Sequence, residues 1–543
     1  MTNPLVVSRI LGDQPFAEIG GPQWAVADMT HGCVIAAGAL GHVDWRGRGS
    51  WKSCRIGVYE AADLRPRHIV PSRYPVCAIA VHPSLPLAAI GTGRYDGTWD
   101  FEGQLLLLHL ETGRVTDLLS KSRQVRHLRW LDDGRLAMLI SPEDKDGGFS
   151  QGFELAVEAT DWLSAPAGLV DPDAVRHPMV ESGLLHDPHA EVVLRDLART
   201  VGAGWERRAG VRAVAALRDG RVLSTGRFTD LECRLPSGAL QWSLPAEGEG
   251  SVQLEVSPGE ESAWVSHRGY RRDPVTGELH ARAPLVHRVA TATGDRVDTV
   301  ELGFGAVLAS NAEGWVVLRD PGTPPEREEW PTVLLTPTHQ EQARLKLPRR
   351  RSGAPTLRIR HSERLIYLDC PRPPDGGEWI CAIEPPGAHG PARLTPLFPL
   401  RWDPASDINP WSGPGIELTD DSGTALVHAG RTFEQGATYR DSREGTCVVR
   451  RHVPDGTAAW VHTSDLPLAD VDGDRDTVYV AYRTGEVEAL DPATGTVRWR
   501  HQLLAHGHAV TPLCVTYDAD RRRLLVGTVD GRILDCSVED GSW

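Results

Sequence analysis

The sequence lacks any long hydrophobic run, and this absence excludes the simplest kind of membrane protein. No stretch of the chain approaches the ~18 uninterrupted apolar residues of a membrane-spanning helix. The amino terminus, Met1 to Ile10, has no basic segment followed by an apolar run, so it does not resemble a secretory signal. We therefore expect a cytoplasmic protein with no membrane partner.

Paired cysteines and excess positive charge are also lacking. The nine cysteines are scattered and include no CxxC pair, which argues against a disulfide framework and against a structural zinc site. The net charge of −15 repels phosphate backbones, so we expect no nucleic-acid partner. Lysine is scarce beside arginine, a skew that we attribute to a GC-rich bacterial genome.

Long amphipathic helices are scarce, whereas turn residues are abundant. The 55 glycines and 40 prolines suit a protein of short strands and tight turns, because glycine permits positive φ and proline is excluded from central strands. An apolar fraction of 41% with 24% charged residues is ordinary for a folded globular chain. The sequence therefore predicts an all-β protein with a large core.

Internal repeats are visible near the carboxyl terminus. Between Val478 and Trp499, two short β-rich runs flank a turn at Gly485, and a second turn from Asp491 to Gly495 precedes a third strand. This segment resembles a quinoprotein-type repeat in Ala489-Leu490-Asp491, Thr494-Gly495 and Trp499. The resemblance implies a β-propeller blade but not the quinone, so we expect no cofactor.

The following segment, 515–538, resembles a WD repeat in which Asp535-Cys536 replaces the usual tryptophan-aspartate pair. Similar strand and turn patterns recur along the chain. They are visible in residues 76–115, 125–139 and 211–223, and in weaker form near 22–73, 250–302, 303–337, 354–399 and 414–463.

These repeats predict a single β-propeller of about eight four-stranded blades, with seven to ten possible. We expect blades in residues 1–160, a partly helical insertion in 161–210, and the remaining blades in 211–543. The terminal unit supplies about three strands, so the extended segment from Pro4 to Ile10 is predicted to add the fourth and close the ring. Two smaller propellers in tandem are the structural alternative.

The predicted insertion contains one helix. Asp187 is a candidate N-cap, Pro188 would occupy the first helical position, and Val193, Leu194, Leu197 and Val201 have helical spacing. We expect this helix to lie on the rim, where its simplest role is to cover the edge of a blade.

One acidic run is a candidate metal site. Asp470, Asp472, Asp474 and Asp476 alternate around Gly473, as carboxylates do in calcium loops. The glutamate that ends an EF-hand loop is missing, because Thr477 leads directly into a strand. We interpret the run as an acidic hairpin turn and predict no metal.

Aromatic and arginine-rich loops are the candidate partner-binding residues. Trp45 and Trp51 flank a glycine-arginine loop, and Tyr95, Trp99 and Phe101 share a second loop, residue types that are enriched where proteins bind partners. Trp51 and Trp99 could instead begin strands and pack between blades. Arg349, Arg350 and Arg351 form a dense basic run, which is either a contact for an acidic partner or a solvated loop.

These features favour a non-catalytic scaffold. The chain has no nucleophile elbow and no phosphate-binding loop, and resemblance to WD-repeat proteins implies that loops on a rigid ring bind another protein. We expect a role in a bacterial multi-protein regulatory or defence system. The alternative is a lactonase-like propeller enzyme or small-molecule sensor with its site at the mouth of the axis.

Overall fold

The computed structural model of the chain divides into two compact units. The larger unit consists of Met1–Gly12 and Gly210–Trp543, and the smaller unit is Asp13–Ala209. The structure describes residues 4–42, 51–95, 100–143, 151–174, 179–181, 189–246, 250–251, 253–266, 270–272, 279–281, 285–302, 307–319, 329–348, 357–372, 377–386, 391–399, 413–433, 444–453 and 455–539.

Both units are built from antiparallel sheets, most of which have the four strands of a β-propeller blade. This confirms the prediction of an all-β fold of the propeller type. Among the described residues, the larger unit has seven sheets and the smaller unit has three. These numbers leave out the short two-stranded hairpins.

The larger unit takes its strands from nearly the whole second part of the chain. Its first three sheets are β16–β19 (Ala213–Ala216, Val222–Thr225, Thr229–Arg234, Leu240–Pro245), β20, β21, β24 and β25 (Gln253–Val256, Ser262–Ser266, Leu285–Ala290, Arg296–Glu301), and β26–β29 (Val307–Ser310, Val316–Arg319, Glu329–Leu335, Glu341–Pro348). The next two are β31–β33 (Ile366–Arg372, Gly377–Glu384, Arg393–Pro399) and β30 (Arg358–Arg360) with β34–β37 (Pro414–Asp420, Gly423–Phe433, Glu444–His452, Ala458–Ser464). The last two are β38–β41 (Leu468–Gly473, Val478–Tyr482, Glu486–Leu490, Val497–Gln502) and β44–β46 (Pro512–Asp518, Arg523–Thr528, Ile533–Val538) with β1 (Leu5–Leu11).

Seven strands of the larger unit contact one another in a cycle, which we call the cycle of first strands; β30 takes the place that β31 would occupy as the first strand of its sheet. β16 contacts β20, β20 contacts β26, and the contacts continue through β30, β34, β38 and β44 back to β16. An apolar cluster fills each of the seven interfaces between successive sheets, and one of them joins β44–β46 to β16–β17. Each sheet therefore buries both of its faces against neighbours.

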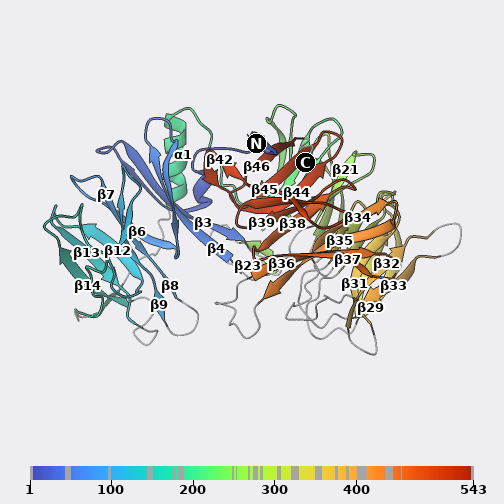
Figure 1. Cartoon of the computed structure of the whole chain (residues 1–543). Helices are drawn as coiled ribbons and strands as arrows, with labels where there is room; N and C mark the ends of the chain where they lie inside the picture. The colour runs from blue at the N-terminus through green and yellow to red at the C-terminus, as the bar shows by residue number, and fades with distance from the viewer. Residues whose placement is uncertain are drawn as a thin grey trace. The chain divides into compact units, whose positions relative to one another are not determined.

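The amino-terminal strand completes the last sheet. β1 pairs antiparallel with β46, with Leu5 opposite Val538 and Leu11 opposite Ile533. Arg9 reinforces the pairing, because its guanidinium contacts Asp535 at 2.6 Å. Figure 1 shows the two chain ends beside β44, β45 and β46. The segment from Pro4 to Ile10 thus supplies the fourth strand of the terminal sheet.

Burial falls from the inner to the outer strands of a sheet. Every residue of β39 is buried, whereas no residue of β41 is buried and half of them are exposed. A short, continuously apolar strand such as Val478–Tyr482 is expected where both faces of a sheet are covered.

A glycine turn locks one sheet to the next. Gly495 has φ +72°, and its backbone N–H bonds the Asp491 carbonyl at 2.8 Å. The Trp460 ring of the preceding sheet lies so close that a Cβ at Gly495 would meet it at 2.6 Å, and its indole donates to the Pro492 carbonyl at 2.8 Å. Gly294 meets Trp242 in the same way.

Three sheets form the smaller unit. They are β2–β5 (Gly21–Asp28, Cys33–His42, Trp51–Glu60, Pro66–Ser72), β6, β7, β10 and β11 (Val76–Val81, Leu87–Thr92, Leu105–His109, Val115–Asp117), and β12–β15 (Val125–Trp130, Arg135–Ile140, Gln151–Glu158, Met179–Glu181). The second sheet packs against the first on one face and the third on the other. Unlike the larger unit, this stack does not return to its first sheet among the described residues.

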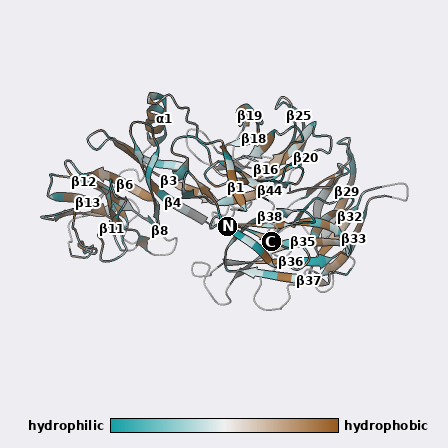
Figure 2. Cartoon of the chain, turned by 45° about the horizontal axis from the view of Figure 1, so that its top comes forward, coloured by the Kyte–Doolittle hydropathy of each residue, from teal (hydrophilic) through white to brown (hydrophobic). Residues whose placement is uncertain are grey.

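The predicted helix is present in the smaller unit as α1, Ala190–Thr200. It is amphipathic, with brown and teal bands in Figure 2, and it buries Leu194 and Ala198 against β2–β5. Val193 and Val201, two of the predicted apolar positions, pack against the same cluster. The helix thus covers a sheet face rather than an edge, while Asp187 and Pro188 lie outside the described residues.

Within the described part of the chain, no helix is both long enough and apolar enough to cross a membrane.

Candidate functional site

Charged side chains gather among the first strands of the larger unit, and we call this group the axial cluster. Its members are Glu255, Arg358, Arg360, His361, Asp470 and Asp472. They come from β20, β30, the residue after β30, and β38.

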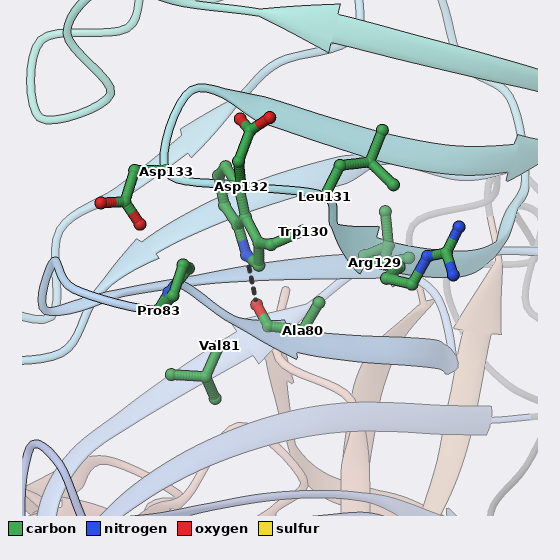
Figure 3. A pocket seen from close by; sticks show the side chains of 9 residues that line it. Ala80, Val81, Pro83, Arg129, Trp130, Leu131, Asp132 and Asp133 are labelled. Carbon is green, nitrogen blue, oxygen red and sulfur yellow. Dashed lines mark hydrogen bonds between the residues drawn. The ribbon is translucent and has the colours of Figure 1, made fainter.

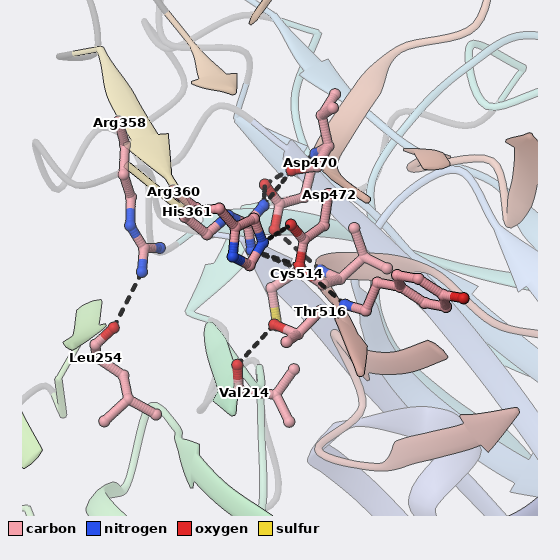
Figure 4. Close-up of polar contacts among 12 residues, drawn as sticks. Val214, Leu254, Arg358, Arg360, His361, Asp470, Asp472, Cys514 and Thr516 are labelled. Atoms are coloured by element: carbon pink, nitrogen blue, oxygen red, sulfur yellow. Dashed lines mark hydrogen bonds and ion pairs between the residues drawn. The ribbon is translucent and has the colours of Figure 1, made fainter. Parts of the chain in front are cut away.

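The short strand β30 positions the two arginines. It pairs parallel with β34 and not with β31, the strand that follows it. Because side chains alternate along a strand, Ile359 enters the apolar core while Arg358 and Arg360 face the other way. Figure 4 shows Arg360 and His361 pointing toward the aspartates and Arg358 reaching toward Leu254.

Arg360 binds two neighbouring strands at once. Its guanidinium contacts Asp470 at 2.9 Å, donates to the Val515 carbonyl at 2.7 Å, and also donates to the carbonyl of Val471. Although burial opposes its charge, Asp470 and Asp472 hold the pKa of Arg360 above its usual value. Arg360 is therefore a permanent cation that ties β30 to β38 and β44.

The two aspartates of β38 accept hydrogen bonds from the backbone of β44. Asp470 accepts from the Val515 N–H at 2.9 Å, and Asp472 accepts from the Tyr517 N–H at 2.8 Å. Side-chain carboxylates thus take the place of strand-to-strand backbone pairing across this junction.

The two aspartates differ in acidity. Burial raises the pKa of Asp470 despite the nearby Arg360. Burial also opposes ionisation of Asp472, but Arg360 and His361 outweigh it and lower the pKa of Asp472 to about 2. Asp472 is therefore the firmly ionised member of the pair at neutral pH.

His361 is the accessible end of the axial cluster. Its Nε2 lies 2.6 Å from Asp472 Oδ1, and 44% of its side chain is exposed. Its φ of +59° is in the left-handed region, which is uncommon for a residue other than glycine or asparagine. The charge of Asp472 raises the pKa of His361 against the effect of burial, so the ring is protonated more readily than a free imidazole.

Arg358 and Glu255 form the second half of the axial cluster. Arg358 Nη2 contacts Glu255 Oε1 at 3.0 Å and donates to the Leu254 carbonyl at the same distance. Ser310 of β26 donates to Glu255 at 2.7 Å. The two arginines of β30 therefore connect opposite members of the cycle of first strands.

This arrangement is saturated with its own partners. Each carboxylate of the axial cluster already contacts a cationic side chain of the cluster, and each also accepts from a backbone N–H or a hydroxyl. Within the axial cluster, the group that can still react is the exposed ring nitrogen of His361. It can exchange a proton with solvent while Asp472 binds the other ring nitrogen.

The predicted acidic run is split by the structure. Asp470 and Asp472 lie in β38 and not in the hairpin turn that we expected, because they alternate along a strand. Asp474 lies in the turn and accepts the backbone N–H of Asp476 at 2.9 Å. No group of three or more potential ligands that could hold a metal is found in the described part of the chain.

The second predicted aromatic loop is a short hairpin, β8 (Arg94–Tyr95) with β9 (Phe101–Glu102). The two rings lie 5.3 Å apart, and Arg126 stands 5.1 Å from the Phe101 ring centre. Phe101 is only 3% exposed, so the expectation that this residue faces a partner is wrong. Its ring packs beneath a buried arginine instead.

The other predicted contact residues are placed less fully. Trp51 is the first residue of β4, which agrees with the alternative that it begins a strand. Trp45, Trp99, Arg349, Arg350 and Arg351 lie outside the described residues.

Sequence reasoning missed Glu255, Arg358, Arg360 and His361. The alternation of Arg358, Ile359 and Arg360 was the available signal. It places two charged side chains on one face of a short strand, and such side chains require polar partners. Their partners lie more than 100 residues away in the chain, and no local pattern identifies them.

The smaller unit has a shallow cavity of about 680 Å³ between its second and third sheets. Val81, Pro83 and Leu131 line it together with Asp132 and Asp133. Figure 3 shows the Trp130 indole donating to the Ala80 carbonyl, a bond of 3.1 Å that ties the two sheets together. Trp130 is therefore a structural contact at this cavity.

No family model matches the chain, and no curated protein sequence matches it. Many solved structures share some of its fold. A crystal structure of the computationally designed Ika8 protein aligns at 11% identity and TM-score 0.38, covering 61% of this chain and 97% of that one. BamB from Moraxella catarrhalis aligns at 13% identity and TM-score 0.38, covering 60% and 96% respectively. Likenesses of this size say nothing about the function of this chain.

Proposed function

We propose that the larger unit is a closed seven-bladed β-propeller and that the chain is a non-catalytic scaffold that binds another protein in the cytoplasm. The cycle of first strands and the seven apolar interfaces support the ring. In this proposal a seven-bladed ring with a three-sheet insertion replaces the single ring of about eight blades. The relation to WD-repeat and quinoprotein-like proteins belongs to the same proposal.

One observation carries the scaffold proposal. Asp470 and Asp472 hold the β38–β44 junction together through Arg360, His361 and two backbone N–H groups. Acids that serve as structural ties have no spare oxygen for catalysis on a substrate. A ring whose axial charges are neutralised internally is suited to presenting its outer loops to partners in a fixed arrangement.

Affinity purification of the tagged full chain from its native host, followed by mass spectrometry, tests this proposal. We expect at least one protein that is retained in near-stoichiometric amount and places the chain in a bacterial regulatory or defence assembly. Recovery of the chain alone at several ionic strengths would contradict it. Ionic strength must be varied because interfaces that depend on charge weaken as salt screens them.

One observation favours a second function, a small-molecule sensor or enzyme at the axis. His361 is half-exposed and paired to an ionised aspartate, a combination that can donate or accept a proton. Thermal-shift screening of a metabolite panel, with His361→Asn as the control, tests it. A compound that stabilises the wild type and not the variant would favour the sensor over the scaffold.

A further inference from the structure

A second cavity of the larger unit, of about 950 Å³, is unrelated to the axial cluster. It lies between the sheet β31–β33 and the sheet that contains β34–β36, where Tyr367, Ala382, Leu397, Glu417 and Val453 line it. We call it the acidic pocket. Its size is within the ~300–1,000 Å³ typical of ligand sites.

The lining of the acidic pocket has excess negative charge. Glu313, Glu363, Glu384 and Glu417 line it, against Arg364 and Arg393. None of these six residues takes part in an ion pair within 4.0 Å with another residue that the structure describes. The acids are therefore available to a cation that enters from outside.

Glu417 and Tyr367 form the deep end of the acidic pocket. Glu417 is 9% exposed and accepts hydrogen bonds from the Ser362 hydroxyl at 3.1 Å and the Glu363 N–H at 3.2 Å. Both donors are neutral, so they orient the carboxylate without cancelling its charge. A buried carboxylate of this kind gains most from a cationic partner.

Tyr367 adds a polar group beside Glu417. It is 2% exposed, and its hydroxyl lies next to the Glu417 carboxylate without a hydrogen bond of normal geometry. Burial and the neighbouring Glu417 raise the pKa of Tyr367, so the hydroxyl stays protonated. An unsatisfied buried hydroxyl costs free energy that a bound polar group would recover.

Apolar side chains form the walls above this polar end. Leu365, Leu397 and Val453 line the pocket with prolines at positions 385, 386 and 391. A charged head on a methylene stem matches such a site, because the stem packs on the walls while the head reaches the carboxylate. Guanidinium fits better than ammonium, since its planar fork can bond a carboxylate with two N–H groups and stack on a flat ring.

We propose that the acidic pocket binds an arginine side chain presented by an extended segment of another protein. This deepens the scaffold function and rests on it. Arg364 and Arg393 lie toward the exposed side of the lining, where they would exclude a segment with a neighbouring cation and favour one with a neighbouring acid.

Isothermal titration calorimetry on the full chain tests the proposal. The probes are acetyl-Gly-Arg-Gly-amide, the same peptide with citrulline in place of arginine, and agmatine. Citrulline keeps the shape of arginine but has no charge. We expect the arginine peptide to bind at least about tenfold more tightly than the citrulline peptide, because a charged hydrogen bond contributes about 1.5 to 3 kcal/mol.

Two variants locate the binding. Glu417→Gln removes the charge and keeps one of the two oxygens that accept from Ser362 and Glu363, so it should weaken the arginine peptide at least about tenfold. Glu384→Gln, on the exposed side of the pocket, should weaken it less and serves if Glu417→Gln does not fold. Glu301→Gln is the matched control, since Glu301 is exposed on β25 and does not line the pocket.

Equal binding of the two peptides, or unchanged binding in both pocket variants, would overturn the proposal. Binding of agmatine without the peptide would also overturn it, because the source would then be a free amine. These outcomes can be distinguished from a failure of the proposed scaffold function. A partner that co-purifies with the wild type while the peptide does not bind leaves the scaffold standing without this pocket.

Discussion

Asp472 belongs to a run of alternating aspartates, but its physical role differs from that of Asp476 in the same run. It is fully buried and contacts His361 and the Tyr517 N–H, whereas Asp476 is exposed in the turn. The distinction comes from the strand that ends at Gly473, which places the first two aspartates inside and the next two outside.

Replacing Asp472 with asparagine should destabilise the larger unit. The change leaves Arg360 and His361 without their shared anion, and breaking a buried ion pair from one side costs about 3 to 5 kcal/mol. Urea unfolding followed by circular dichroism measures the loss. Asp476→Asn is the control and should change stability by no more than about 0.5 kcal/mol. Equal effects would show that Asp472 is not a structural tie.

His361 should make stability depend on pH. Because its folded pKa is raised above the unfolded value of 6.5, its contribution is full below that value and is lost as pH rises through the folded pKa. Asparagine tolerates the left-handed backbone at this position, so His361→Asn removes the titration without adding strain.

The measurement is the melting temperature of both proteins from pH 5 to 9. We expect the wild type to exceed His361→Asn most at the acidic end and the difference to shrink with rising pH. A difference that does not change with pH would mean that the imidazole is not protonated beside Asp472.

At the scale of elements, the sequence predicted the turn from Asp491 to Gly495 but not the side chain that packs on it. The Thr-Gly pair marks a tight turn by its chemistry alone. Trp460, which packs on that turn, belongs to the preceding sheet, and only the folded structure shows that the missing side chain of Gly495 makes room for it.

Gly495→Ala should therefore lower the free energy of unfolding by more than backbone strain alone would. Alanine at positive φ costs about 1 to 2 kcal/mol, and a Cβ forced against a packed ring adds about 1 to 3 kcal/mol. Gly507→Ala isolates the first contribution, because Gly507 has φ +81° and open space around its missing Cβ. Urea unfolding of both variants should show the larger loss in Gly495→Ala, and equal losses would contradict a lock between sheets.

Local sequence patterns do not reveal contacts between distant strands, and this explains why most residues of the axial cluster were not predicted. Strand and turn signals are local, so the sheets and the closing role of Pro4 to Ile10 followed from them. The parallel pairing of β30 with β34 breaks the regular pattern in which each sheet is made from consecutive strands. Arg358 and Arg360 reach their partners only because of that exception.

At the scale of the whole molecule, the sequence of the smaller unit is inserted into the sequence of the larger unit. Leu11 and Val211 share one apolar cluster although residues 13–209 lie between them. The sequence resemblance to repeats could not show this, because blades of both units have the same strand and turn chemistry.

Deletion of residues 13–209, with a short glycine-serine linker, should leave the larger unit folded. Leu11 and Val211 already pack in one apolar cluster, and a short flexible loop costs little entropy to close. Circular dichroism and a single cooperative melting transition would confirm this. An unfolded or aggregated product would show that the smaller unit is needed for the fold.

The stability of the sheet formed by β1 and β44–β46 should depend on the buried face of β1. Leu5 is fully buried among residues of β44–β46, whereas 40% of the adjacent Val6 is exposed. Leu5→Ala should cost about 2 to 5 kcal/mol, and Val6→Ala no more than about 0.5 kcal/mol. Hydrogen exchange in β46 should rise in the first variant only, and slow exchange in both would mean that β1 does not protect β46.

The pairing of β1 with β46 also sets an order of events during synthesis. Arg9 and Asp535, which meet across this pair, are 526 residues apart, so the first strand leaves the ribosome long before its partner exists. Residues 13–209 can fold while translation continues, but the sheet that contains β1 must wait until β46 has been made. A chain that stops before β46 would leave β1 unpaired, with an open edge for quality-control proteases to recognise.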